Sequence, residues 1–147
     1  MRFADLGLDA SKEYLVYEFW SDRMTGTFKD VFPYGTLEPY GLKSYAIREK
    51  LNRPQILSTN RHLSQGGADL LDVQWDERTL TLSGKSEVVA EDAYTLVLHL
   101  PDGYRVESAD FDGRPAKVAP EGNLARVGLR PAESKDVGWS VKFGRDR

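Results

Sequence analysis

The chain has 147 residues, a formal net charge of −3 and no cysteine. Its length is typical of one domain and too short for a complete (β/α)8 barrel, which needs about 250 residues. The mildly acidic charge and the lack of a basic stripe argue against a nucleic-acid partner. No window is apolar enough to predict a membrane span. Because the chain also has no signal-peptide pattern, the composition favours a cytoplasmic location.

The first predicted strand, residues 14–20, is apolar on both faces. One face carries Leu15, Tyr17 and Phe19. The other face carries Tyr14, Val16 and Trp20. A strand that is apolar on both faces is covered on both sides, so we expect the second face to meet loops of the chain, a partner chain or a missing domain. Among the tryptophans, Trp20 is the best candidate for binding or docking.

Residues 54–67 are predicted to begin as a strand and to end as a polar loop. The loop closes on Gly66-Gly67, which suits a special backbone conformation. Its best helical stretch, residues 61–66, is long enough for one turn only. The candidate ligand-binding side chains of this region are those of Arg61, His62, Gln65 and Asp69. A lone histidine in a loop is more often structural than catalytic.

After residue 70, apolar and polar side chains alternate with the period of two that marks a strand with one buried face. The alternating segments are residues 71–75, 80–83, 95–100, 125–130 and 139–143. The phase of this pattern predicts Trp75 and Trp139 to be core residues. It predicts His99, which lies opposite the leucines of its strand, to be a surface residue.

Turn sequences separate these strands. Proline and glycine in residues 100–104 and again in 120–123 favour turns, and Phe111-Asp112-Gly113-Arg114 predicts a two-residue hairpin with a type I′ turn. Strands that recur about every 8–12 residues, without a helical stripe between them, indicate a β-sandwich. We therefore predict an all-β fold, an antiparallel β-sandwich of two packed sheets with hairpin and Greek-key connections, as a single domain over residues 1–147.

Motifs of known catalytic and metal centres are missing from the sequence. It has no Gly-x-Ser-x-Gly elbow, no thiol, no His-x-x-x-His and no calcium loop. Asp69, Asp72 and Asp76 are near in sequence, but strand alternation points Asp69 and Asp72 to different faces, so we interpret them as ordinary solvated carboxylates and not as a metal site. A carboxylate pair for glycoside hydrolysis stands about 5–5.5 or about 6.5–9.5 Å apart, which sequence spacing does not decide. The sequence thus predicts no catalytic residue, no metal and no cofactor.

Six segments share packing patterns with one family of accessory domains. They are Asp5-Leu6-Gly7-Leu8, Tyr14 to Trp20, Leu42 to Arg48, Arg53 to Gly66, Phe111 to Pro115 and Trp139 to Phe143. Together they resemble the β-sandwich domain that follows the catalytic barrel in α-galactosidase (melibiase)-like glycoside hydrolases. The resemblance covers most of the chain. In that family the catalytic aspartates lie on the barrel, and no residue here matches them.

The resemblance implies a non-catalytic, C-terminal accessory domain excised from a glycoside hydrolase. Its partner would be the catalytic (β/α)8 barrel of the same parent chain, and a complete small protein that begins at Met1 is the alternative. The expected docking residues are Tyr14, Val16 and Trp20, together with the loop at Arg61–Gln65.

Two other functions remain open at this point. One is a carbohydrate-binding module, in which exposed aromatic rings stack on sugars. Its hydroxyl-binding residues would be Arg61, His62, Gln65 and Asp69. The other is a free-standing hydrolase that uses a carboxylate pair without a sequence motif.

Overall fold

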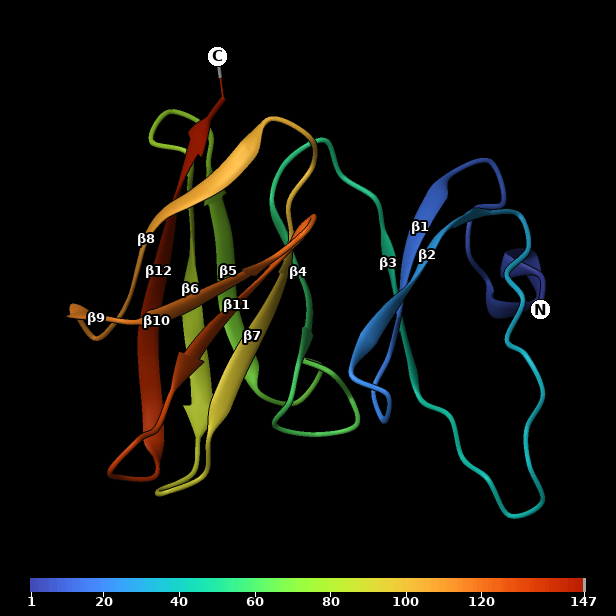
Figure 1. Cartoon of the computed structure of the whole chain (residues 1–147), viewed down its shortest axis with the longest axis horizontal. Helices are drawn as coiled ribbons and strands as arrows, with labels where there is room; N and C mark the ends of the chain where they lie inside the picture. Colours follow the sequence, from blue (N-terminus) through green and yellow to red (C-terminus); the bar gives the residue numbers. More distant parts are fainter. Residues whose placement is uncertain (147) are drawn as a thin grey trace. The chain divides into compact units, whose positions relative to one another are not determined.

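The computed structural model describes residues 1–146, and Figure 1 shows that the regular elements of the chain are almost all β-strands. Within these residues the strands form three antiparallel sheets, and the one helix is a 3₁₀ turn, η1 (Phe3–Leu6). The prediction of an all-β antiparallel fold is confirmed. No helix among the described residues has the length and apolar character that crossing a membrane requires.

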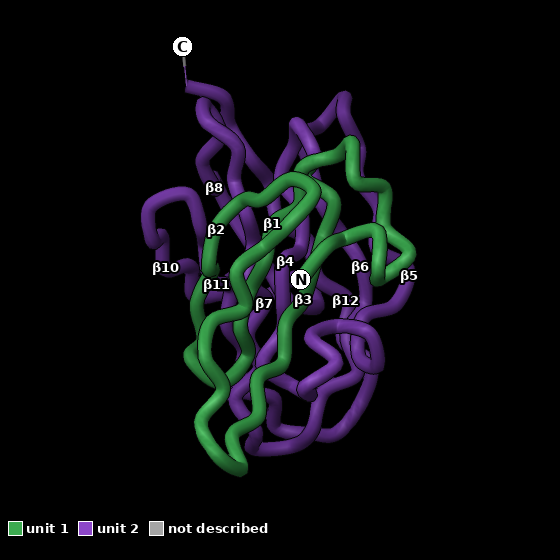
Figure 2. The backbone as a smooth tube through the Cα atoms, turned by 90° about the vertical axis from the view of Figure 1, so that its right-hand side faces the viewer, with its two compact units in different colours: residues 1–50 green, residues 51–147 purple. Residues whose placement is uncertain are grey.

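The chain divides into two compact units, Met1–Lys50 and Leu51–Arg147 (Figure 2). We call them unit 1 and unit 2. The sequence predicted one sandwich over the whole chain, whereas unit 1 has a sheet and a hydrophobic cluster of its own. Both packed sheets of the predicted sandwich lie in unit 2.

Unit 1 contains a three-stranded sheet with the order β2-β1-β3. Its strands are β1 (Glu13–Glu18), β2 (Arg23–Lys29) and β3 (Tyr45–Glu49). Tyr14 and Val16 of β1 pack in one cluster with Phe3 of η1 and with Phe32. The ring centroid of Phe3 lies 4.7 Å from that of Tyr14 and 5.8 Å from that of Phe32. The N-terminal segment of the chain therefore covers the face of β1 that carries Tyr14 and Val16.

Unit 2 is a sandwich of two antiparallel sheets, which face each other in Figure 1. The four-stranded sheet has the order β10-β11-β7-β4. Its strands are β4 (Gln55–Thr59), β7 (Tyr94–His99), β10 (Lys117–Glu121) and β11 (Leu124–Leu129). The five-stranded sheet has the order β5-β6-β12-β8-β9. Its strands are β5 (Leu70–Asp76), β6 (Thr81–Val88), β8 (Tyr104–Phe111), β9 (Arg114–Pro115) and β12 (Lys135–Arg145).

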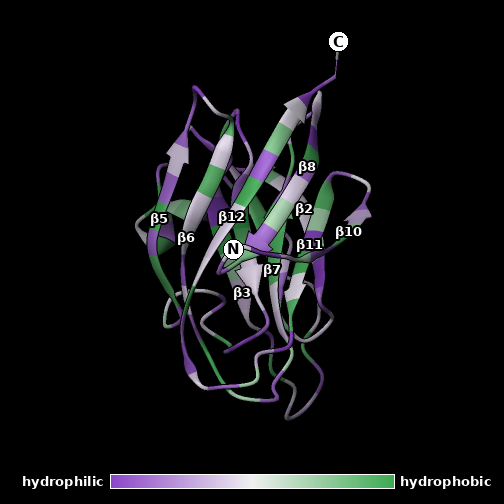
Figure 3. Ribbon diagram, turned by 90° about the vertical axis from the view of Figure 1, so that its left-hand side faces the viewer, coloured by the Kyte–Doolittle hydropathy of each residue, from purple (hydrophilic) through white to green (hydrophobic). Residues whose placement is uncertain are grey.

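The core of unit 2 lies between these two sheets. Leu96 and Leu98 of β7 contribute from one sheet, and Trp139 and Val141 of β12 contribute from the other. Figure 3 shows the alternation of hydrophobic and hydrophilic residues along β6 and β12 that produces this buried face. Trp139 is buried, as predicted, and Trp75 packs partly buried against the same cluster.

The predicted hairpin at Asp112-Gly113 is confirmed. Asp112 has a φ of 48° and Gly113 a φ of 73°. Phe111 and Arg114 pair across the turn. Two successive positive φ angles define a type I′ turn, which matches the twist of the strands that it joins.

Two predictions about which residues face the core are wrong. His99 was expected on the surface but is only 3% exposed, because β7 is buried on both faces and not on the leucine face alone. Leu71 and Val73 were expected to share a buried face with Trp75, but they are 41% and 44% exposed. A β-bulge between Leu71 and Gln74 breaks the alternation there.

Candidate functional site

Trp20 is the most exposed of the three docking residues that the sequence predicted in unit 1. Its exposed fraction is 58%, and its ring packs edge-on against Phe19 with the ring centroids 5.1 Å apart. The expectation placed Trp20 on the same strand face as Tyr14 and Val16. Strand β1 ends at Glu18, however, so Trp20 lies in the following turn and does not continue the alternation.

The buried Glu18 carboxylate holds this turn in place. It accepts hydrogen bonds from the backbone N–H groups of Trp20 at 3.2 Å, Ser21 at 2.7 Å and Ser44 at 3.3 Å. Burial by itself raises the pKa of Glu18, but these hydrogen bonds to the charged form outweigh it and bring the pKa below its ordinary value. The charge of one carboxylate thus determines how the backbone presents Trp20.

Tyr14 and Val16 are buried in the cluster of unit 1, at 4% and 0% exposure. Their burial within this unit removes the reason for assigning their face to an external partner. Of the predicted docking residues in unit 1, Trp20 is the one whose side chain lies on the surface.

A second exposed apolar surface in unit 1 was not predicted. We call residues 31–42, in the connection from β2 to β3, the apolar loop. Its exposed hydrophobic side chains are Val31, Tyr34, Leu37, Tyr40 and Leu42. The available sequence signal was the presence of four bulky residues between 34 and 42, among prolines and glycines, without strand alternation.

The apolar loop has anchors at one end and a turn at its tip. The Tyr45 hydroxyl donates to the carbonyl oxygen of Tyr34 at 2.9 Å, and Nζ of Lys43 donates to the same oxygen at 3.1 Å. The backbone N–H of Gly41 donates to the carbonyl of Glu38 at 2.8 Å and closes a turn. Tyr40 occupies the third position of that turn with a φ of 62° and is fully exposed. A bulky residue with positive φ is strained, and such strain is concentrated at functional positions.

The predicted binding residues of unit 2 separate into two groups. Arg61 is half-buried and His62 is exposed. Nδ1 of His62 lies 3.1 Å from Oγ of Ser64, within the same turn. Gln65 and Asp69 are buried, at 1% and 3% exposure, so the prediction that Asp69 is a solvated carboxylate is wrong. The loop therefore directs the latter two side chains into the protein, and the four residues do not form one surface site.

Asp69 belongs to a chain of buried hydrogen bonds across unit 2. The Tyr94 hydroxyl donates to Oδ2 of Asp69 at 2.8 Å and lies 2.7 Å from Oγ of Ser86. Nε1 of Trp139 donates to the same Ser86 oxygen at 2.9 Å, and the Thr59 hydroxyl donates to Oδ1 of Asp69 at 3.2 Å. Burial raises the pKa of Tyr94 far above its ordinary value, so its hydroxyl stays protonated. These bonds fasten the loop to the sandwich core.

Gln65 forms a further buried hydrogen bond that holds the same loop. Its backbone has a φ of 53°, and its side-chain carbonyl oxygen accepts a hydrogen bond from the Ser58 hydroxyl at 3.0 Å. The buried side chains of Gln65 and Asp69 thus have hydrogen-bond partners within the protein, which is the usual condition for buried polar groups. We assign Gln65 and Asp69 a structural role.

A pocket of about 430 Å³ lies at one end of unit 2, and none of the predicted site residues lines it. We call it the end pocket. Its lining residues are Phe111, Asp112, Arg114, Leu129, Arg130, Pro131, Ala132, Glu133, Lys135 and Val137. Among the described residues, no group of three His, Cys, Asp or Glu side chains is arranged to hold a metal ion.

Comparisons with family models, with curated proteins and with solved structures match nothing to this chain.

Proposed function

We propose that this chain is a non-catalytic accessory domain of a glycoside hydrolase, and that it docks on a catalytic (β/α)8 barrel of the same parent chain through the apolar loop of unit 1. The resemblance to α-galactosidase-like enzymes supplies the class of parent. The all-β architecture is compatible with that class. The observation that carries the docking role is the exposed apolar side chains at residues 31–42.

The physical argument concerns the cost of leaving such side chains in water. Burial of apolar surface contributes about 25 cal/mol per Å², and contiguous exposed apolar patches mark interaction surfaces. Tyr34, Leu37 and Leu42 are each at least half exposed, and Tyr40 is fully exposed. Contacts between domains of one chain bury about 600–1,500 Å², and these four residues suit the apolar centre of a contact of that size.

The test begins with the reading frame upstream of Met1. The proposal requires it to encode a barrel-sized segment, and a frame without one would contradict it. In the parent polypeptide, amide hydrogen exchange at residues 31–42 should be slower than in this chain alone. The double variant Leu37→Ser/Leu42→Ser should abolish that protection in the parent.

A matched control variant is available in unit 2. Leu71 and Val73 are also exposed apolar residues, on the edge strand β5. The variant Leu71→Ser/Val73→Ser should leave the protection of residues 31–42 unchanged. Equal loss in both double variants would show a general effect of lowered hydrophobicity and would argue against docking through the apolar loop.

Carbohydrate binding is a second candidate function, favoured by the exposed rings of Trp20, Tyr34 and Tyr40 in unit 1. Exposed aromatic rings can stack on the apolar faces of sugars. Titration of the chain with galactosides, followed by tryptophan fluorescence, should then change the emission of Trp20, whereas the buried Trp139 should respond little. The response should disappear in Trp20→Phe, and no response at millimolar sugar would contradict this function.

A further inference from the structure

We propose that the end pocket of unit 2 binds a small hydroxylated carboxylate, of the size of one or two sugar rings, with Arg114 as the residue that receives the carboxylate. This inference goes beyond the proposed accessory function and does not depend on docking by unit 1. The pocket of about 430 Å³ is within the usual range of small-molecule sites, about 300–1,000 Å³.

The walls of the end pocket are preformed by backbone hydrogen bonds. The hairpin tip is fixed to β12, because the N–H of Asp112 donates to the carbonyl of Gly138 at 2.7 Å. The β11–β12 connection is fixed as well, because the carbonyl of Pro131 accepts a bond from the N–H of Glu91 at 2.8 Å. The Ser134 hydroxyl oxygen accepts another from Ala90 at 2.9 Å. A preformed site loses little conformational entropy on binding.

The floor of the end pocket is apolar. Phe111, Pro131 and Val137 are buried, and Leu129 is partly buried. These side chains offer a surface to the carbon skeleton of a ligand, while the charged side chains stand at the rim. A largely apolar lining with a few charged groups is the common composition of ligand pockets.

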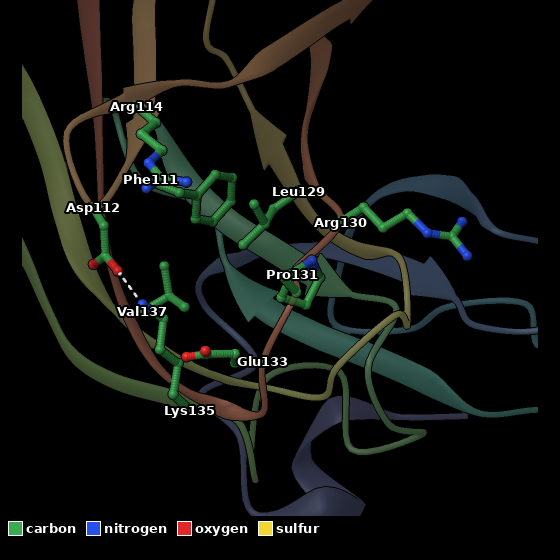
Figure 4. A pocket seen from close by; sticks show the side chains of 10 residues that line it. Phe111, Asp112, Arg114, Leu129, Arg130, Pro131, Glu133, Lys135 and Val137 are labelled. Atoms are coloured by element: carbon green, nitrogen blue, oxygen red, sulfur yellow. Dashed lines mark hydrogen bonds and ion pairs between the residues drawn. The ribbon is translucent and has the colours of Figure 1, made fainter.

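The charged side chains of the rim divide into satisfied and available groups. Asp112 is satisfied, since one carboxylate oxygen lies 3.0 Å from Nζ of Lys135 and the other accepts a bond from the N–H of Gly138 at 2.9 Å. The hydrogen-bonded ion pair with Lys135 is the largest cause that lowers the pKa of Asp112, and the backbone hydrogen bond from Gly138 is the next. Arg130 extends away from the other lining side chains in Figure 4, and its Nε lies 3.6 Å from a carboxylate oxygen of Glu91.

Arg114 and Glu133 are the two charged groups that these contacts leave for a ligand. Among residues 1–146 neither side chain forms an ion pair or a hydrogen bond, although the charge of Arg114 helps to lower the pKa of the nearby Asp112. Figure 4 shows the Arg114 side chain reaching toward Phe111, above the apolar floor. A guanidinium binds a carboxylate with two parallel hydrogen bonds, and the Glu133 carboxylate can accept hydrogen bonds from ligand hydroxyls.

The pairing of the charges around the pocket indicates a ligand with one carboxylate. Lys135 pairs with Asp112, and Arg130 pairs with Glu91 outside the lining, so one cation, Arg114, and one carboxylate, Glu133, remain. A ligand with one carboxylate for Arg114 and hydroxyl groups for Glu133 matches these two charges. A phosphate monoester, with a charge of about −1.5 to −2, would be repelled by Glu133 more strongly than a carboxylate.

The test uses the full chain labelled with ¹⁵N, and glucuronate as the probe. Glucuronate should shift the amide signals of residues 111–114 and 129–137, and the response should weaken as salt is raised. Glucose, which lacks the carboxylate, should leave these signals in place. Glucose 6-phosphate should bind more weakly than glucuronate, and tighter binding of the phosphate would overturn the assignment of ligand class.

Variants separate the role of Arg114 from a general effect of charge. Arg114→Gln should weaken glucuronate binding about ten-fold or more, the loss expected for a charge-assisted hydrogen bond. Lys117→Gln removes one positive charge from an exposed position on β10 outside the pocket lining. This variant should bind glucuronate as tightly as the unsubstituted chain does. The amide spectrum of each variant also reports whether the fold is intact.

A variant of Glu133 tests recognition of the hydroxyl groups. Glu133→Gln should reduce the preference for glucuronate over acetate, because acetate has no hydroxyl to donate. The proposal would be overturned if glucuronate caused no shifts of the amide signals at residues 111–114 and 129–137. It would also be overturned if Arg114→Gln and the unsubstituted chain bound glucuronate equally well.

Discussion

The Tyr94 hydroxyl donates a hydrogen bond of 2.8 Å to the buried carboxylate of Asp69. This contact joins β7, in one sheet of unit 2, to the loop that leads into the edge strand of the other sheet. The carboxylate is 3% exposed and cannot exchange this donor for bulk water.

We expect Tyr94→Phe to lower the free energy of unfolding by about 1–3 kcal/mol, because it leaves a buried carboxyl group without this hydrogen-bond donor. Urea unfolding followed by circular dichroism measures this change. Tyr104→Phe is the control, since its hydroxyl contacts Arg145 at an exposed site. Equal losses of unfolding free energy in the two variants would show that the buried hydrogen bond stabilises the protein no more than the exposed one.

Glu18 gives the stability of unit 1 a defined pH dependence. The pKa of the folded-state carboxyl lies below its ordinary value, so its contribution is fully present above about pH 4.5 and is lost as the pH falls through the folded pKa. Glu18→Gln should cost about 1 kcal/mol at neutral pH. This difference in stability between Glu18→Gln and the unsubstituted chain should shrink on acidification, as measured by urea unfolding at several pH values. A difference independent of pH would contradict the assigned role of the charge.

Gly84 on β6 is required by the packing of Trp139. A Cβ at this position would lie 2.6 Å from a ring carbon of Trp139 and 3.1 Å from the carbonyl oxygen of Leu71. We expect Gly84→Ala to lower the free energy of unfolding by about 1–3 kcal/mol, the usual cost of overpacking a core. Denaturant unfolding with fluorescence of the buried tryptophan measures it.

A matched control for this prediction is Gly128 on β11, where an added Cβ would lie 3.9 Å from its nearest neighbour, the carbonyl oxygen of Tyr94. We expect Gly128→Ala to be nearly neutral. A neutral Gly84→Ala, or equal costs at the two positions, would show that β6 can move away from Trp139.

A substitution at Tyr40 can test the proposed docking without a loss of folding stability. Its positive φ favours glycine, so Tyr40→Gly should leave the melting temperature of the isolated chain unchanged or slightly higher. In the parent polypeptide the same change should reduce the protection of residues 31–42 from hydrogen exchange. Loss of stability in the isolated chain would instead assign Tyr40 a packing role.

Short-range patterns in the sequence predicted much of the local structure. The alternation in residues 139–143 placed Trp139 in the core, because side chains of a strand point alternately to its two faces. Asp112-Gly113 predicted its hairpin because few residues tolerate two successive positive φ angles. Trp20, the docking candidate, lies at the surface, but the sequence pattern placed it on a strand and not in the turn where it lies.

Long-range packing determined the rest, because burial depends on what lies above a strand and not on its own pattern. It buried His99 and drew Asp69 into the interior, where Tyr94 and Ser86 complete its hydrogen bonds. It also brought the Asp112 hairpin beside the β11–β12 connection to form the end pocket. The sequence by itself determined an all-β chain and its turns. Only the tertiary structure decided which polar groups are enclosed and which are left at the surface, because these depend on contacts between segments far apart in the chain.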